Sequence, residues 1–314
     1  MRWAHAIICA ALLASALAAP EAMAQATRLP SSIVTATRPL TPEESRALGD
    51  FLEQNLVKLG GAEQDAVRAA RSELIRVLSQ STATPLFRSE CSKALLPRLN
   101  EIVGSKDQFS ATNALEVMRA LCTSDSVLAL CKVADPDSQR SAALRLVAAS
   151  GIPSSIAKTT MNDAQAAIVV RAMKQAIQSE SSWMAATYDF QALFALATSK
   201  TVPAPAQKEA RKAQVDAIKS LAERVAKGGD EAALVHALWR SLGVVLQQQV
   251  ALTPAGELAA MNKGLSPVLA KVVAMGDAPP KGAGASDSDF REVASVAGNL
   301  RTILGRTSGR PRGS

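Results

Sequence analysis

The stretch from residue 126 to 151 constrains the fold of this chain more than any other segment. A short apolar run is followed by a turn at Asp135-Pro136-Asp137 and then by an alanine-rich run. Because Pro136 has no backbone N–H to donate, it stops a helix that precedes it. Asp137, or the serine after it, is expected to cap a second helix, and Gly151 to end that helix in a left-handed conformation. The segment therefore predicts two antiparallel helices joined by a tight turn.

The composition favours helices along the rest of the chain. Hydrophobic residues make up 48% of it, dominated by alanine and leucine, and aromatic residues only 3%. Alanine and leucine lose little entropy in a helix, whereas runs of the β-branched and aromatic residues that favour strands are nearly absent. The expected helices, joined by short turns, are 41–59, 62–78, 85–103, 110–121, 125–133, 138–149, 162–178, 182–198, 205–226, 230–250, 253–276 with a break near 264–267, and 290–304.

Short connections make neighbouring helices antiparallel. The sequence therefore predicts an all-α fold of stacked antiparallel helical hairpins, with an irregular helical bundle as the alternative. Segment 99–121 can be laid over 128–149, which places Ala114 on Ala143. An internal period of about 30 residues lies in the range typical of α-solenoids. No convincing repeat is visible after Thr198.

The turn and the helix after it resemble a HEAT-type repeat of the short kind found in phycobilisome-lyase-related proteins. The residues that carry this resemblance are Asp135, Pro136, Asp137, Arg140, Ala142, Ala143 and Gly151. The resemblance implies a HEAT-like α-solenoid whose concave face binds a protein or a polymer. It implies that Arg140 bonds between repeats, and it supplies no catalytic residues.

Residues 1–24 read as a secretory signal peptide. Arg2 precedes a small-residue apolar run at 6–19, and Ala22-Met23-Ala24 matches the A-x-A cleavage pattern. An N-terminal membrane anchor is the alternative, although the run is short for a span. We therefore expect a bacterial protein that is exported, periplasmic or secreted. The expected parts of the remaining chain are an extended tether (25–40), a helical repeat-like domain (41–276), a flexible linker (277–288), a short helix (289–306) and a basic disordered tail (307–314).

Export to an oxidising compartment makes a disulfide plausible among the three cysteines that follow the leader. Cys91 and Cys122 lie about 12 residues before and after the turn near 103–109, so they are level on two antiparallel helices. They are the favoured disulfide pair. A Cys122–Cys131 pair, or three small buried thiols, are the alternatives.

Positive charge gathers at the carboxyl end of a chain whose formal net charge is +7. The last residues hold Arg301, Arg306, Arg310 and Arg312 without an acidic residue among them. Such a tail favours an anionic polymer or lipid as a partner, and a merely solvated end is the alternative. No nucleic-acid partner is expected.

Residues that carry catalysis are scarce. His236 is the one histidine after the leader, and the sequence has no His-Glu-x-x-His, Cys-x-x-Cys, Gly-x-Ser-x-Gly or phosphate-binding Gly-Lys-Ser/Thr motif. We therefore expect no catalytic residue, cofactor or metal. The candidate binding surface is the aromatic cluster of Trp183, Tyr188, Phe190 and Phe194, for which core packing is the alternative.

These observations lead to three hypotheses about function. The first is a non-catalytic exported scaffold that binds another envelope protein through a helical-repeat surface. The second is a structural envelope component that contacts an anionic polymer or membrane through its basic C-terminus. The third is an enzyme with an unrecognised helical active site.

Overall fold

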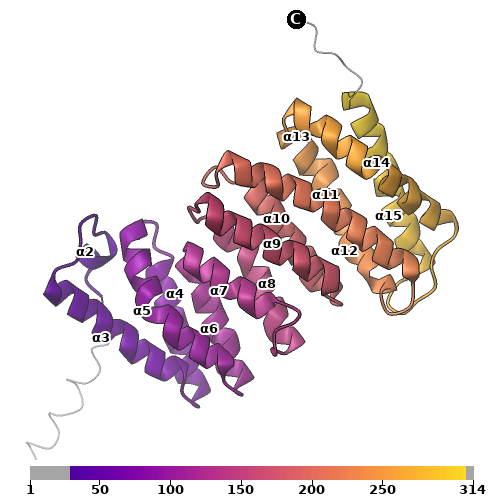
Figure 1. Ribbon diagram of the computed structural model, residues 1–314. Helices are drawn as coiled ribbons and strands as arrows, with labels where there is room; N and C mark the ends of the chain where they lie inside the picture. The colour runs from indigo at the N-terminus through magenta and orange to yellow at the C-terminus, as the bar shows by residue number, and fades with distance from the viewer. Residues whose placement is uncertain (1–28, 309–314) are drawn as a thin grey trace, which may run out of the picture.

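The computed structural model describes residues 29–308, and within this range its regular elements are helices (Figure 1). An isolated β-bridge joins Gly229 and Gly282. The elements are α2 (Ser31–Val34), α3 (Pro42–Leu59), α4 (Gln64–Leu78), α5 (Pro85–Gly104), α6 (Gln108–Leu121), α7 (Ser124–Ala134), α8 (Ala142–Ile156), α9 (Asp163–Ser179), α10 (Trp183–Thr198), α11 (Ala204–Lys227), the 3-10 helix η1 (Ala232–Leu234), α12 (Val235–Val244), the π-helix η2 (Val245–Gln249), α13 (Val250–Leu252), α14 (Ala255–Asp277) and α15 (Asp287–Ser308).

These helices form hairpins that stack side by side in two layers. Helices α3, α5, α7, α9, α11 and α14 form the nearer layer in Figure 1, and α4, α6, α8, α10, α12 and α15 form the farther one. The main contacts join each helix to its hairpin partner and to the neighbouring helices of its own layer, and α10 also packs against α11 of the next hairpin. The buried hydrophobic residues form one cluster that runs from Ile33 to Leu304. The predicted all-α stack of antiparallel hairpins is thus confirmed.

The period of the stack is longer than the sequence overlay suggested. Successive helices of the near layer start at Pro42, Pro85, Ser124, Asp163 and Ala204. One period therefore takes about 40 residues, which fits the range of HEAT and armadillo units. The hairpins α11–α12 and α14–α15 continue the stack beyond Thr198, where the sequence shows no repeat.

The 126–151 segment folds as a hairpin, but its second helix was placed too early. Pro136 follows the end of α7 as expected, and Asp135 Oδ1 accepts a hydrogen bond from the Asp137 backbone N–H at 3.0 Å. The cap of α8 is Ser141, whose hydroxyl accepts from the Leu144 N–H. Asp137 therefore belongs to the turn and does not cap the helix.

Gly151 lies inside α8 and does not end it. A Cβ atom added to this residue would lie 3.4 Å from the Cβ of Arg119 on α6, so Gly151 lies in the contact between these two helices. The alanines expected to serve this purpose, Ala142 and Ala143, are exposed, whereas Ala148 and Ala149 are buried.

The sequence overlay was out of register for the same reason. Asp107 caps α6 and Ser141 caps α8, so these two residues are equivalent in the structure. When they are aligned, Ala114 falls on Ala148, and both alanines are buried. The overlay had placed Ala114 on Ala143, which is exposed.

Three further segments differ from expectation. The expected tether contains α2, whose Ile33 and Val34 are buried and whose Val34 carbonyl accepts from the Thr84 N–H at 3.1 Å. Helix α14 runs unbroken through Gly264 and Pro267. The expected helix at 230–250 is divided into η1, α12, η2 and α13, without a side-chain cap at its start. Glu231 there pairs with Arg224 at 2.8 Å instead of capping.

Arginine side chains bind backbone carbonyls at the carboxyl ends of neighbouring helices. The Nη1 atom of Arg88 donates to the Ala120 carbonyl at 3.2 Å, and that of Arg211 donates to the Ala197 carbonyl at 2.9 Å. Arg224 Nη1 donates to the carbonyls of Ile177 and Glu180. The last carbonyls of a helix lack intrahelical donors and carry the negative end of its dipole, so a guanidinium satisfies both needs.

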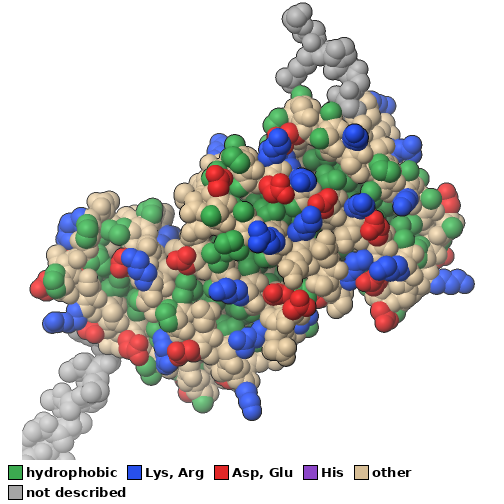
Figure 2. All heavy atoms as spheres, viewed as in Figure 1, with side chains coloured by type: hydrophobic (Ala, Val, Ile, Leu, Met, Phe, Trp, Pro, Cys, Tyr) green, Lys and Arg blue, Asp and Glu red, His purple; other side chains and the backbone are tan. Residues whose placement is uncertain are grey.

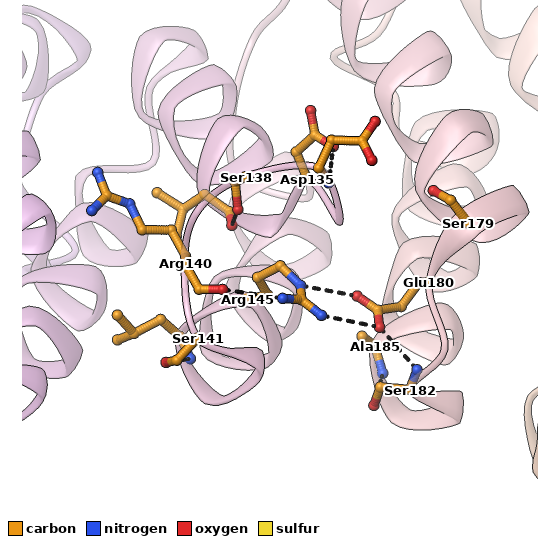
Figure 3. Close-up of polar contacts among 12 residues, drawn as sticks. Asp135, Ser138, Arg140, Ser141, Arg145, Ser179, Glu180, Ser182 and Ala185 are labelled. Carbon is orange, nitrogen blue, oxygen red and sulfur yellow. Dashed lines mark hydrogen bonds and ion pairs between the residues drawn. The ribbon is translucent and has the colours of Figure 1, made fainter.

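A buried ion pair joins the hairpin α7–α8 to the hairpin α9–α10 (Figure 3). Both carboxylate oxygens of Glu180 accept from the Arg145 guanidinium, at 3.2 and 3.4 Å, and the Ser182 N–H adds a third bond. Arg145 also donates to the Arg140 carbonyl at 3.1 Å. The Arg140 side chain points away from Glu180 in Figure 3 and lies near Gly104 at the end of α5. The bonds between these hairpins therefore come from Arg145, while Arg140 contributes its backbone.

Asp189 on α10 is a buried carboxyl group whose Oδ1 atom has no hydrogen-bond partner. Burial raises its pKa well above the usual range, and the nearby Glu180 carboxylate raises it further. Burial, and then Asp189, also raise the pKa of the Cys131 thiol. The centre of the stack thus holds a carboxyl group that is costly to ionise.

The structure holds Cys91, Cys122 and Cys131 as free thiols, so the expected Cys91–Cys122 disulfide is not formed in it. Helix α6 ends at Leu121, and Cys122 leaves it in a left-handed conformation with φ of 51°. The expectation placed Cys122 on the helix, level with Cys91, but its Sγ atom instead donates to the Arg119 carbonyl at 3.4 Å. Cys91 is fully buried in α5, and this burial raises its pKa to about 12.

We expect Glu180→Ala to lower the free energy of unfolding by about 3 kcal/mol, because it leaves the mostly buried Arg145 guanidinium without its carboxylate partner. Urea unfolding followed by circular dichroism measures the loss. The control is Glu101→Ala, which removes an exposed pair with Arg98 and should cost less than about 1 kcal/mol. Equal losses in both variants would show that the buried pair does not fasten the hairpins.

We expect Asp189→Asn to stabilise the protein at pH 7 by on the order of 1 kcal/mol, because the amide brings no charge into the buried site. The folded chain binds the Asp189 proton more tightly than the unfolded chain, so wild-type stability falls as the pH rises above about 4. The gain should therefore shrink as the pH is lowered toward 4. Unfolding curves at several pH values test this, with the exposed Asp137→Asn as the control for net charge. A gain that does not change with pH would contradict the buried carboxyl's role.

We expect one thiol to react rapidly with Ellman's reagent in the folded chain without residues 1–24. Cys122 is partly exposed, whereas Cys91 and Cys131 are buried. Unfolding in denaturant without a reductant should expose all three thiols. If only one thiol reacts even after unfolding, a disulfide links the other two, and the free-thiol arrangement is wrong.

Candidate functional site

An exposed patch of aromatic rings and one guanidinium lies where α10 begins and α12 passes it. The Cζ atom of Arg240 lies 5.7 Å from the ring centroid of Trp183 and 5.7 Å from that of Trp239. The Trp183 and His236 rings are 5.3 Å apart and tilted by 55°. Contacts within about 6 Å are favourable cation–π interactions. We call Trp183, His236, Trp239 and Arg240 the tryptophan–arginine patch.

Helix geometry explains how the patch forms. His236, Trp239 and Arg240 are three and four residues apart on α12, so they share one face. Trp183 is the first residue of α10 after the Ser182 cap, and α10 and α12 are neighbours in the far layer. The patch therefore comes from two successive hairpins and depends on their stacking.

The patch remains accessible. Trp239 keeps 37% of its surface exposed, and Met184, which follows Trp183, keeps 42%. A chain with so few aromatic residues gathers Trp183 and Trp239 around one arginine. Tryptophan and arginine are the residue types most enriched where binding energy concentrates in protein interfaces.

His236 ties the patch to the loop between α14 and α15. Its Nε2 atom lies 3.0 Å from the Gly284 carbonyl, and its Nδ1 atom lies 4.0 Å from Asp289 Oδ1. The hydrogen bond from the Ser286 side chain lowers the pKa of Asp289, followed by that from the Ser286 backbone, with a smaller effect of His236. The His236 ring thus holds the edge of the patch against the last hairpin, α14–α15.

The four aromatic residues singled out from the sequence do not lie together on one surface. Trp183 belongs to the patch, and Tyr188 is half-buried against the core. Phe190 is 1% exposed and lies in the core, so its place in a binding surface was wrong. Phe194 is half-buried. Phe190 lies two turns into α10, between the two layers of helices. Trp183 lies at the end of α10, where neighbouring helices no longer cover the side chain completely.

Of the basic end, Arg301 and Arg306 are exposed on α15, whereas Arg310 and Arg312 lie outside the described residues. No group of three His, Cys, Asp or Glu side chains suited to a metal ion occurs within residues 29–308. In the same range, no helix combines the length and hydropathy that crossing a membrane requires.

No family model and no curated protein matches this chain. Among solved structures, a designed armadillo repeat protein is similar at 13% identity and a TM-score of 0.43, over 81% of this chain and 99% of the other. An engineered protein is similar at 15% identity and a TM-score of 0.43, over 80% of this chain and 96% of the other. These likenesses are loose, and the repeat fold is assigned from the stacked hairpins themselves. Stacks of this kind present extended surfaces suited to binding other proteins.

Proposed function

We propose that this chain is an exported helical-repeat scaffold that binds another envelope protein through the tryptophan–arginine patch. The observation that carries the proposal is the placement of Arg240 between two partly exposed indole rings. The two indole rings and the guanidinium already restrict one another through their mutual contacts. They therefore lose little conformational entropy when a partner covers them, and more of the contact energy remains as affinity. The proposal assigns no catalysis to the chain.

The unit of the stack supports the HEAT type within this proposal. HEAT units contain two helices and armadillo units three. From α3 to α12 each period holds one near-layer and one far-layer helix, apart from the short η1. The Arg145–Glu180 pair then supplies the bond between repeats that the family resemblance assigned to Arg140.

The basic end supports the second candidate, a structural envelope component. Arg301 and Arg306 are exposed near the end of α15 and lie beside a shallow hollow formed with Val273 of α14. An anionic polymer would gain from both charges. Leu304 is buried, so removal of residues 301–314 would damage the core, and charge-neutral substitutions are the better test.

We expect Trp239→Ala/Arg240→Ala to abolish capture of the partner from a bacterial envelope extract and to weaken binding of the purified partner at least tenfold. Truncated hot-spot residues typically cost about 2 kcal/mol or more. The matched control is Ile168→Ala/Arg171→Ala, which removes an exposed apolar residue and an arginine from α9. Quantitative mass spectrometry of the captured proteins and calorimetry with the purified partner measure the two effects.

A third variant changes Arg301, Arg306, Arg310 and Arg312 to glutamine. Loss of capture in this variant alone would favour the structural envelope role. Capture of the same proteins by the patch variant and the wild type would contradict the proposed function.

A further inference from the structure

A second surface lies on the near layer, along the seam between the parallel helices α11 and α14. Two hollows of about 440 and 740 Å³ lie on this seam. Between the two hollows α11 and α14 are in close contact. A Cβ atom added to Gly264 would lie only 2.8 Å from Val215 Cγ1, so glycine permits this approach. From Lys208 to Ala226, the α11 side of the seam extends roughly 27 Å at 1.5 Å per residue.

The floor of the seam is apolar and made of small or flexible side chains. Met261 and Val215 line the first hollow, and Ala222, Val268 and Met275 line the second. Methionine adapts its shape to different partners and is frequent in grooves that accept helices. The length, the parallel walls and the apolar floor together fit a helix laid in a groove.

The rims of the seam carry unbalanced positive charge. Lys208, Lys212, Lys219 and Lys271 line the two hollows, against Glu209 and Glu223. The remaining charged pair, Arg211 and Glu257, is joined at 2.6 Å and is neutral as a unit. Figure 2 views this face and shows lysine and arginine side chains, interspersed with acidic ones, around hydrophobic side chains over α11 and α14. The rims therefore carry a surplus of two positive charges.

The charge selects among occupants. The chain's own basic end, with Arg310 and Arg312 beyond the described residues, would be repelled by these lysines. An acidic segment would be attracted, and like charge would exclude a basic one. The groove thus discriminates by sign as well as by shape.

We propose that the α11–α14 seam binds an amphipathic helix of a partner protein, with an apolar stripe flanked by acidic residues. The stripe covers the Met and Ala floor, and the acidic flanks face Lys219 on one wall and Lys271 on the other. This surface is separate from the tryptophan–arginine patch, and its occupancy does not depend on the function proposed above.

The test uses the purified full chain and three fluorescein-labelled helical peptides of about 20 residues, the length that fills the groove. The first has a leucine stripe flanked by glutamates, the second has lysine in place of each glutamate, and the third has the first composition with the stripe scrambled. Fluorescence anisotropy measures each affinity. We expect the first peptide to bind at least tenfold more tightly than the other two.

Charge reversal on the protein then separates the groove from general attraction. Lys219→Glu/Lys271→Glu should weaken binding of the acidic peptide at least tenfold and strengthen binding of the basic one. The charge-matched control, Lys106→Glu/Lys132→Glu, changes exposed lysines far along the chain and should leave both affinities within twofold. Ala274 is exposed and lines the second hollow, so Ala274→Trp should fill that hollow and block the acidic peptide without any change of charge.

Equal effects of the two lysine variants, or equal binding of the scrambled peptide, would overturn the proposal, as would failure of the acidic peptide to bind. The patch variant Trp239→Ala/Arg240→Ala should bind the acidic peptide as the wild type does, so the two proposals can fail separately.

Discussion

The longer helices of residues 29–308 bury apolar side chains against their hairpin partners and against the neighbouring hairpins. Small side chains line the contacts between neighbouring helices of one layer: Ala148 and Ala149 are buried on α8, and Gly151 lies against Arg119 of α6. Stability in such a stack is the sum of hairpin terms and neighbour terms, without a single closed core. The stack therefore leaves two broad faces exposed, and both surfaces described above lie where successive hairpins meet.

Apolar packing alone leaves the register between neighbouring hairpins undetermined, and polar contacts determine it. Guanidinium groups bridge helix ends at Ala120, Ala197 and Ile177, and the Arg145–Glu180 pair joins two hairpins through charge-assisted and backbone bonds. Directional bonds of this kind fix one arrangement among many that would bury similar area. The buried Oδ1 atom of Asp189 has no hydrogen-bond partner, so Asp189 opposes the stability that its neighbours supply.

The sequence predicted the helices whose first residues form a recognisable N-terminal cap. Thr41 with Glu44 and Asn162 with Gln165 form the capping boxes that begin α3 and α9, close to where the pattern placed them. The register of α8 was missed because aspartate and serine are equally good caps, so Asp137 and Ser141 could not be distinguished from the sequence. Spacing favoured a Cys91–Cys122 pair because the left-handed exit of Cys122 from α6 cannot be read from the sequence.

The tryptophan–arginine patch was only half visible in the sequence. The spacing of His236, Trp239 and Arg240 on one helix face was a usable signal, but the contact with Trp183 depends on the meeting of two hairpins. The α11–α14 seam was invisible for the same reason. Its two walls lie on separate hairpins, and the surplus of lysine appears only when they are brought together.

The open stack of hairpins is tested most directly by the distance between its two ends. Spin labels at the exposed Gln54 on α3 and Lys271 on α14, with Cys122 changed to serine, report this distance by double electron–electron resonance. Five steps between near-layer helices at about 8–10 Å each predict a separation of roughly 45 Å. A single distance below about 25 Å, which is no more than three such steps, would mean that the first and last hairpins meet in a closed bundle, and it would contradict this account.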